Sequence, residues 1–215
     1  IMDRYATYSG SDPRKAPAVL STIAFVEESF GAWHVKGGLG NLTTTVHQRA
    51  VDVGVTFHLN SPVASIQTTG NKATGVVLAD GTIVNADAVI ANADASLVYN
   101  RLITGHKRAL KKARKNIANA DVSVAGFSLL LGMRKDPEQV LNHHTILFPE
   151  NYDAEFDAIF KEGKPVEKPT IYICAPQDEL MSKDENLEGW FVLVNAPTHG
   201  QFDWSNSEFA SKYAN

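Results

Sequence analysis

The chain has 215 residues, of which 44% are hydrophobic and 20% charged, a composition typical of globular proteins and not of disordered ones. Its 20 basic and 24 acidic residues give a net charge of −4, which excludes nucleic-acid binding driven by overall charge. The single cysteine, Cys174, excludes an intramolecular disulfide and is typical of a reducing compartment.

The first third of the sequence predicts two helices separated by glycines. In AVLSTIAFVEESF (18–30) and in NLTTTVHQRAVDVGV (41–55), apolar residues recur three or four positions apart, which indicates amphipathic helices. The stretch 37–40 interrupts this pattern. The N-terminal residues contain no basic segment followed by an apolar one, so no signal peptide is predicted, and we expect a piece of a longer polypeptide.

Strand patterns follow. Residues 55–69 alternate loosely, Gly70-Asn71 indicates a turn, and Asp80-Gly81 predicts a hairpin between GVVLA (75–79) and TIV (82–84). DAVIANAD (87–94) is expected to be a short, buried strand with a polar end.

The second half predicts one basic helix and a second sheet. HKRALKKARKNIANA (106–120) is helical and rich in Lys and Arg, with Ile103, Leu110 and Ile117 on one stripe. Residues 149–165 predict a helix with Phe156, Ile159 and Phe160 turned inward and with Asp153, Glu155 and Asp157 facing solvent. Four apolar runs are expected to form an antiparallel sheet: 122–133, 143–148, 170–176 and 189–197.

The stretch GAWHVKGGLGNL (31–42) is not a phosphate-binding loop. Gly38-x-Gly40 has Thr43 where the third glycine of G-x-G-x-x-G belongs, and a helical pattern rather than a strand precedes it. A hinge that lets a helix begin is favoured, with its backbone pressed close to a ligand.

No metal site is predicted. His143 and His144 are adjacent in a strand pattern, so their side chains are expected on opposite faces, where they cannot easily share an ion. No H-E-x-x-H motif, paired cysteines or G-x-S-x-G motif is present, and no catalytic acid or base can be assigned.

Several strings together resemble the central part of the bacterial-type phytoene desaturases, carotenoid dehydrogenases of the FAD-dependent amine-oxidase-like superfamily. The strings are RYATYSGSDPRKAPAVL, FGAWHVKGGLGNL, DGTIVNADAVIANAD, HHTILFPENYDAEFDAIFKEGKP, PTIYICAPQDE and WFVLVNAP, spread over residues 4–197.

The resemblance implies a mixed α/β (α+β) fold with a partial Rossmann-like FAD lobe and a β-meander. This lobe is interleaved with a substrate lobe built on an antiparallel sheet with helices. We place substrate-lobe segments at 1–35 and 101–215 and the partial FAD-binding lobe at 36–100. The G-x-G-x-x-G fingerprint of such enzymes is not in this sequence, so the 215 residues alone are expected to bind FAD weakly or not at all and to be inactive.

The resemblance also implies cofactor-binding residues. The main chain of Val63 matches the segment that contacts the adenine, although an ordinary strand valine is an equal alternative. Asn92, Ala93 and Asp94 follow an apolar run and are expected near the flavin, with helix capping by Asn92 or Asp94 as the rival interpretation. Gly37 and Gly38 are expected beside the flavin and the substrate passage.

The implied reaction removes two hydrogens from a carotenoid or isoprenoid substrate, for which FAD is the acceptor because no side chain accepts a hydride. Phe25, Phe30, Trp33, Phe127, Leu129 and Leu131 are candidates to line an apolar channel, with core packing as the default. Alternatives are a carotenoid isomerase or ketolase of the same fold, or a non-catalytic lipid- or partner-binding module.

The basic run Lys107–Lys115 is either a solvated helix face or a contact with anionic lipid. With the second interpretation, the protein is expected to be cytoplasmic and peripheral to the membrane.

Overall fold

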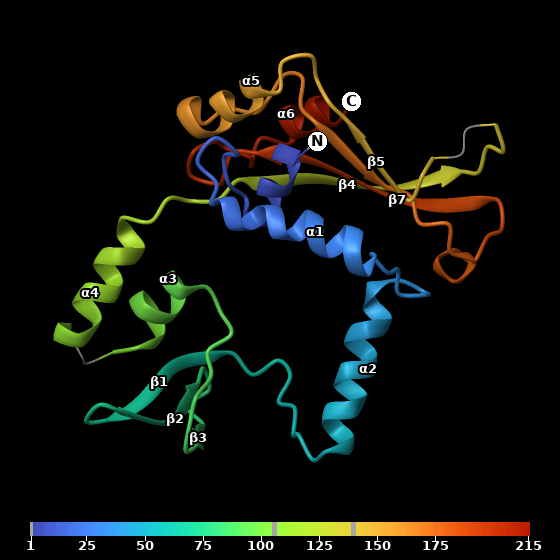
Figure 1. Ribbon diagram of the computed structural model, residues 1–215. Helices are drawn as coiled ribbons and strands as arrows, with labels where there is room; N and C mark the ends of the chain where they lie inside the picture. The colour runs from blue at the N-terminus through green and yellow to red at the C-terminus, as the bar shows by residue number, and fades with distance from the viewer. Residues whose placement is uncertain (1, 105–106, 139–140) are drawn as a thin grey trace. The chain divides into compact units, whose positions relative to one another are not determined.

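The chain passes from one compact group of elements to a second and back again. A computed structural model describes residues 2–104, 107–138 and 141–215. Unit 1 comprises Ile1–Ala50 and Val122–Asn215, and unit 2 comprises Val51–Asp121 (Figure 1). The junctions between the units lie at 50/51 and 121/122, and the FAD and substrate lobes with boundaries at 35/36 and 100/101 stay a prediction.

Unit 1 is built on a four-stranded antiparallel sheet with the strand order β4-β7-β6-β5. Its strands are β4 (Ala125–Arg134), β5 (His144–Leu147), β6 (Ile171–Cys174) and β7 (Leu187–Ala196). All four coincide with the apolar runs identified in the sequence, so the predicted antiparallel sheet is confirmed. The ten-residue β4 and β7 pair along their whole length, whereas β5 is a short strand at the edge.

The core of unit 1 lies where α5 (Asp153–Asp157) and its continuation η4 (Ala158–Glu162) pack on the sheet. Phe156 and Ile159 are 0% and 1% exposed, which confirms that they face inward. Glu155 is also 0% exposed, so the prediction that it faces solvent is wrong. Its two carboxyl oxygens accept hydrogen bonds from the Thr170 N–H at 2.6 Å and the Asn195 amide at 2.7 Å, which explains how a polar side chain is accommodated there.

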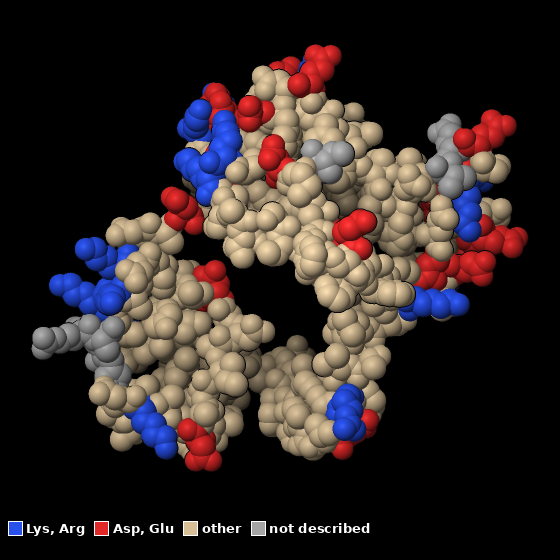
Figure 2. All heavy atoms as spheres, in the orientation of Figure 1, with Lys and Arg blue, Asp and Glu red and all other residues tan. Residues whose placement is uncertain are grey.

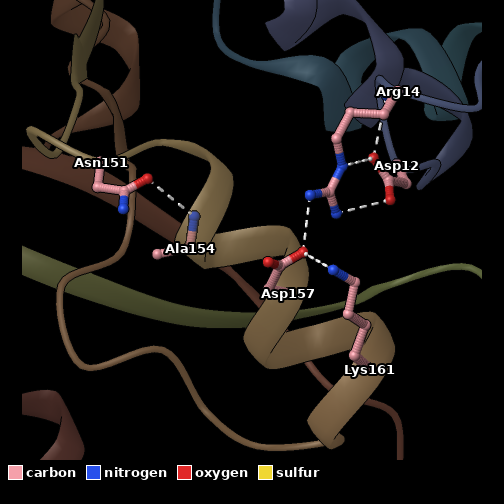
Figure 3. A network of polar contacts seen from close by, with 6 residues as sticks. All are labelled: Asp12, Arg14, Asn151, Ala154, Asp157 and Lys161. Atoms are coloured by element: carbon pink, nitrogen blue, oxygen red, sulfur yellow. Dashed lines mark hydrogen bonds and ion pairs between the residues drawn. The ribbon is translucent and has the colours of Figure 1, made fainter.

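A polar network joins the N-terminal part of unit 1 to α5. The Arg14 guanidinium binds both carboxylate oxygens of Asp12 at 2.9 Å, and its Nη1 reaches Asp157 Oδ1 at 2.7 Å (Figure 3). Lys161, one turn further along the helix, meets the same oxygen at 2.9 Å. At the start of the helix, Asn151 accepts a hydrogen bond from the Ala154 N–H. These bonds tie the loop after η1 (Met2–Ser9) to the helix that covers the core.

The C-terminal helix α6 (Ser207–Ala214) is held by aromatic contacts with the sheet. The ring of Phe127 on β4 lies 5.5 Å from that of Trp204 and 5.2 Å from that of Tyr213. Asn206 caps the helix by accepting from the Phe209 N–H at 3.0 Å. Phe127 is therefore a packing residue of unit 1.

The two predicted helices of the first third are present as α1 (Ser21–Phe30) and α2 (Leu39–Asp52), preceded by η2 (Ala18–Leu20). Gly54, with φ 90°, follows the end of α2, at a position where glycine commonly ends a helix. Their apolar stripes are exposed rather than buried: Val19, Phe30 and Val46 are exposed by 66%, 70% and 60%.

Unit 2 contains a three-stranded antiparallel meander of β1 (Val63–Thr69), β2 (Lys72–Leu78) and β3 (Ile83–Asn85). Both predicted turns are present, at Gly70-Asn71 and at Asp80-Gly81, where Gly81 has φ 88°. The meander and the mixed α/β architecture with antiparallel sheets are thus confirmed.

Three short helical elements complete unit 2: α3 (Ala95–Leu97), η3 (Val98–Leu102) and α4 (Lys107–Ala118). Val98 and Leu110 are buried, and Ile66 on β1 forms a bridge with Ile103, so η3 packs on the meander and α4 packs on η3 and α3. Arg114 donates to the carbonyls of residues 99 and 103, which anchors α4 on η3.

One predicted strand does not form. Residues 88–92 are irregular, and the Ile90 side chain is 93% exposed. A strand is stable only when its backbone N–H and C=O groups pair with a neighbour, and no strand in the described part of the chain pairs with these residues. The segment is apolar, as expected, but it has no partner strand among the described residues.

Candidate flavin and substrate site

The glycine stretch forms the turn between α1 and α2. Gly31, Gly37 and Gly38 have φ values of 80°, 78° and 90°, a region that disfavours other residues. The Gly38 N–H donates to the Val35 carbonyl at 2.8 Å, and its own carbonyl accepts from the Asn41 N–H, which starts α2. The expected start of a helix at these glycines is confirmed, whereas their role as a hinge close to a ligand stays a prediction.

The carboxylate of Asp178 holds this turn. Its Oδ2 accepts from the Gly37 N–H at 2.5 Å and lies 2.9 Å from His34 Nε2, while Oδ1 accepts from the Leu180 N–H at 2.9 Å. The Asp178 side chain is only 4% exposed. The Gly37 N–H, followed by His34 and Leu180, lowers the pKa of Asp178 to about 2, because each bond favours the ionised form.

Neighbouring side chains leave little room at these glycines. A Cβ on Gly37 would lie 2.3 Å from the Asn41 amide nitrogen, and one on Gly38 would lie 3.4 Å from the Met181 methyl group. The positive φ values of the turn therefore account for both glycines without a ligand. Their expected place beside the flavin and the substrate passage stays a prediction.

Asp178 and Met181 also border a hollow of about 730 Å³, a volume within the range of ligand sites. The hollow lies between the end of β4, the start of β7 and η5 (Glu179–Met181). Figure 2 shows acidic side chains gathered at this end of the sheet. Its charged lining does not suit a hydrocarbon. Six of the lining residues are acidic: Asp136, Asp178, Glu179, Asp184, Glu185 and Glu188.

The remaining predicted cofactor residues lie in unit 2. Val63 is the first residue of β1, pairs with Leu78 and is 39% exposed. A register irregularity follows it, between Val63 and Ser65. The structure is compatible both with main-chain recognition by Val63 and with an ordinary strand valine.

Asn92, Ala93 and Asp94 are exposed in the irregular segment before α3. Asp94 caps this helix: its carboxylate accepts from the Ser96 N–H at 2.8 Å and from the Ser96 hydroxyl. The Ser96 hydroxyl and then its N–H lower the pKa of Asp94. The capping alternative is therefore confirmed for Asp94, whereas a role of the three residues near the flavin stays a prediction.

The candidate channel residues separate into two groups. Phe25, Phe30 and Trp33 project from α1 and the turn after it, with 64%, 70% and 88% of their surface exposed. Phe127, Leu129 and Leu131 alternate along β4 and share one face of the sheet, where Phe127 is covered by aromatic rings. All three side chains of the first group are largely exposed, whereas those of the second group are more covered.

A group that the sequence analysis missed lies at the edge of the sheet in unit 1. The candidate metal-ligand atoms of His143, His144 and Cys174 are all within 4.8 Å of one another. His143 precedes β5 and so escapes the alternation of a regular strand, and its ring lies 4.5 Å from that of His144. The prediction that the two histidines point to opposite faces is wrong for this reason.

Two further residues surround this group. His144 Nδ1 lies 2.8 Å from the Tyr172 hydroxyl, and the His34 ring contacts that of His143 at 4.9 Å. Burial, and then the His144 and His34 rings, lower the pKa of His143. The doublet HH was visible in the sequence, but its pairing with Cys174 depends on strand register.

Comparison with known proteins identifies the family of this chain. Residues 6–149 match the family of flavin containing amine oxidoreductases. The chain belongs to this family. Membership of a flavin oxidoreductase family agrees with the resemblance found in the sequence.

Several curated relatives of this chain have names that refer to the conversion of carotenoids. It is 34% identical to the 1-hydroxycarotenoid 3,4-desaturase of Flavobacterium sp., over 99% of this chain and 42% of that protein. It is 35% identical to the zeta-carotene-forming phytoene desaturase of Myxococcus xanthus (92% and 37%). It is 31% identical to the 4,4'-diapolycopene oxygenase of Methylomonas sp. (82% and 34%). The chain thus spans about two fifths or less of the length of these relatives.

Proposed function

We propose that this chain is part of an FAD-dependent oxidoreductase that desaturates phytoene or a related carotenoid precursor. The observation that carries the proposal is the similarity to two curated carotenoid desaturases over 92% to 99% of the chain. Family membership supports a flavin as the redox group.

The chemistry requires such a group. Desaturation removes two hydrogens from adjacent carbons of a hydrocarbon, and bound FAD supplies the acceptor that side chains lack. The residues of this chain would bind and orient FAD and the substrate. The Val63 main chain would contact the adenine, and Asn92, Ala93, Asp94, Gly37 and Gly38 would border the flavin.

The Rossmann-like character of residues 36–100 is part of the proposal. The exposed, unpaired segment around Ile90 supports it, because an apolar run of this kind fits a strand whose neighbours belong to another part of the enzyme. The diphosphate-binding motif G-x-G-x-x-G is absent from these residues, so they fit only part of a flavin site.

The substrate is proposed to contact exposed apolar side chains among Phe25, Phe30 and Trp33. These side chains have no titratable group, as is expected for a surface that binds and orients a polyene without reacting with it. Each is exposed by 64% or more, an unfavourable arrangement unless another surface or a ligand covers it.

A second candidate function is the oxidation of a carotenoid end group. It is favoured by the similarity to the 4,4'-diapolycopene oxygenase, which covers 82% of this chain. This candidate corresponds to the ketolase alternative of the same fold. An isomerase and a non-catalytic lipid- or partner-binding module gain no specific support from these relatives.

The test uses the natural polypeptide that carries this chain, supplied with FAD and with phytoene in lipid vesicles. We expect flavin-dependent formation of products with longer conjugation, followed by their absorption at longer wavelengths and by mass spectrometry as losses of two hydrogens. A gain of oxygen favours the second candidate. A polypeptide that binds no flavin, or one that converts neither phytoene nor a hydroxylated carotenoid, refutes the proposal.

A cytoplasmic location with peripheral membrane contact is also proposed. Lys111, Lys112 and Lys115 are exposed on α4, and Figure 2 shows basic side chains on this helix. The side chains of Lys107 and Arg108 lie outside the described part of the chain. Leu110 is buried, so the charged face of α4 is what is left to attract lipid.

Sedimentation with anionic vesicles tests this contact. No helix among the described residues is long and apolar enough to cross a bilayer. Replacing the three lysines by glutamine should weaken binding, and Lys72→Gln on β2 is the matched control. Equal sedimentation of the two variants would remove the idea.

A further inference from the structure

The edge of the four-stranded sheet brings two imidazoles and the only thiol of the chain together. His144 and Cys174 are register partners on β5 and β6, and the His143 carbonyl accepts from the Ala175 N–H at 2.9 Å. Two backbone contacts therefore fix the three side chains in neighbouring positions. The Sγ and one nitrogen of each ring lie within 4.8 Å of one another.

We propose that His143, His144 and Cys174 form a zinc-binding site. Imidazole and thiolate are the ligands that Zn²⁺ prefers, and three protein ligands leave a fourth position for water. In a tetrahedral site, bonds of about 2.0–2.3 Å place ligand atoms roughly 3.3–3.7 Å apart. The observed limit of 4.8 Å is about 1 Å wider, a difference that side-chain rotation can close.

The surroundings suit an ion. The Tyr172 hydroxyl lies 2.8 Å from His144 Nδ1 and fixes this ring, as outer hydrogen bonds commonly do for metal-bound imidazoles. His34, whose ring touches His143, is itself paired with Asp178 at 2.9 Å, which places a carboxylate–imidazole pair beside the site. His144 is exposed and the other two ligands are half-buried, so an ion can enter from solvent.

Binding would replace the Cys174 S–H bond by a Zn–S bond and release one proton to solvent, with no change of oxidation state. The ion would link β5 to β6. Because β5 has four residues and lies at the edge of the sheet, it has few backbone bonds of its own. A zinc ion would therefore stabilise the least supported strand of this sheet.

The test is titration of the tag-free, reduced chain with Zn²⁺ and, as a spectroscopic probe, with Co²⁺. We expect one equivalent of Zn²⁺ to bind with a Kd below about 1 μM and to raise the unfolding temperature. Co²⁺ should produce a thiolate charge-transfer band in the near ultraviolet. Cys174→Ser should abolish this band, and His143→Gln and His144→Gln should each weaken Zn²⁺ binding by about 100-fold or more.

His58→Gln is the matched control, because this histidine is exposed in unit 2, and its affinity for Zn²⁺ should equal that of the unmodified chain. Circular dichroism of Cys174→Ser checks that the sheet is retained. No saturable binding below about 100 μM, or equal affinity in Cys174→Ser and His58→Gln, overturns the proposal. None of these measurements depends on flavin or carotenoid, so the result is independent of the proposed enzymatic function.

Discussion

The buried carboxyl group of Glu155 provides the sharpest test of the packing of unit 1. It is 0% exposed, and its oxygens accept from the Thr170 N–H at 2.6 Å and the Asn195 amide at 2.7 Å. Glu155→Leu replaces the carboxyl side chain by an apolar one of similar size and so removes both acceptor oxygens. The Thr170 N–H and the Asn195 amide are then buried donors without a partner, because a Leu side chain has no hydrogen-bond acceptor.

The expected loss of stability follows from these two donors. Each buried group left unsatisfied costs about 1–3 kcal/mol, so Glu155→Leu should lower the free energy of unfolding by about 2–6 kcal/mol. In the double variant Glu155→Leu/Asn195→Ala only the Thr170 N–H is orphaned. The double variant should therefore be more stable than Glu155→Leu by about 1–3 kcal/mol, apart from the small cavity at position 195.

Chemical denaturation followed by tryptophan fluorescence measures these differences. All three tryptophans, Trp33, Trp190 and Trp204, belong to unit 1, so the signal reports this unit alone. The exposed Glu167→Leu is the matched control and should change stability by less than about 0.5 kcal/mol. A loss below about 1 kcal/mol for Glu155→Leu, or a double variant that is less stable than the single one by the full cost of Asn195→Ala, refutes the reasoning.

Three other substitutions test the turn, the core and the meander. Asp178→Asn should destabilise the chain at neutral pH, as measured by fluorescence-detected unfolding. The pKa of Asp178 is lowered from 3.8 to about 2, so the ionised carboxylate stabilises the folded chain. The difference in stability from wild type should therefore be constant above pH 5 and disappear as the pH falls from about 4 to 2. Phe156→Ala, at a fully buried position, should lower the free energy of unfolding by about 3–5 kcal/mol in the same assay. Gly75→Ala should loosen β2 and β3 more than Gly81→Ala in amide hydrogen exchange, because its Cβ would lie 2.2 Å from the Val84 carbonyl oxygen whereas Gly81 has open space.

Each of these results has a contrary outcome. A difference between Asp178→Asn and wild type that grows on acidification would show that the ionised carboxylate is not the stabilising form. A Phe156→Ala variant with nearly unchanged stability would mean that the helix α5 does not carry the core. Equal exchange rates in the two glycine variants would show that the close approach at Gly75 is not a constraint.

Most elements of this fold were predictable because local patterns determine them. The turns at Gly70 and Gly81 and the strands of the second sheet depend on residue types only a few positions apart, and all are present. The failures involve long-range partners. The apolar segment around Ile90 is not a strand, because no described strand pairs with it, and Glu155 is buried because Thr170 and Asn195 satisfy it.

The candidate site shows the same division. The sequence indicated that a helix begins at Gly37 and Gly38, but the carboxylate that holds the turn before this helix comes from Asp178, 141 residues after Gly37. The cofactor roles of these glycines, Val63 and residues 92–94 stay predictions, since they concern a ligand and not the packing of the chain. The proximity of His143 and His144 to Cys174 could not be predicted from the sequence. It depends on the register between β5 and β6, and the sequence of neither strand determines that register.

The sequence by itself determined the family, the positions of α1, α2, α4 and α5, of the turns and of most strands, and the apolar character of the side chains proposed to contact a polyene. Only the tertiary structure decided which polar groups meet: Asp178 with the glycine turn, Glu155 with its two donors, and two histidines with one cysteine. The physical reason is that hydrophobic periodicity is a local property of the chain, whereas a hydrogen bond or a metal site requires atoms from distant segments to lie within a few ångströms of one another.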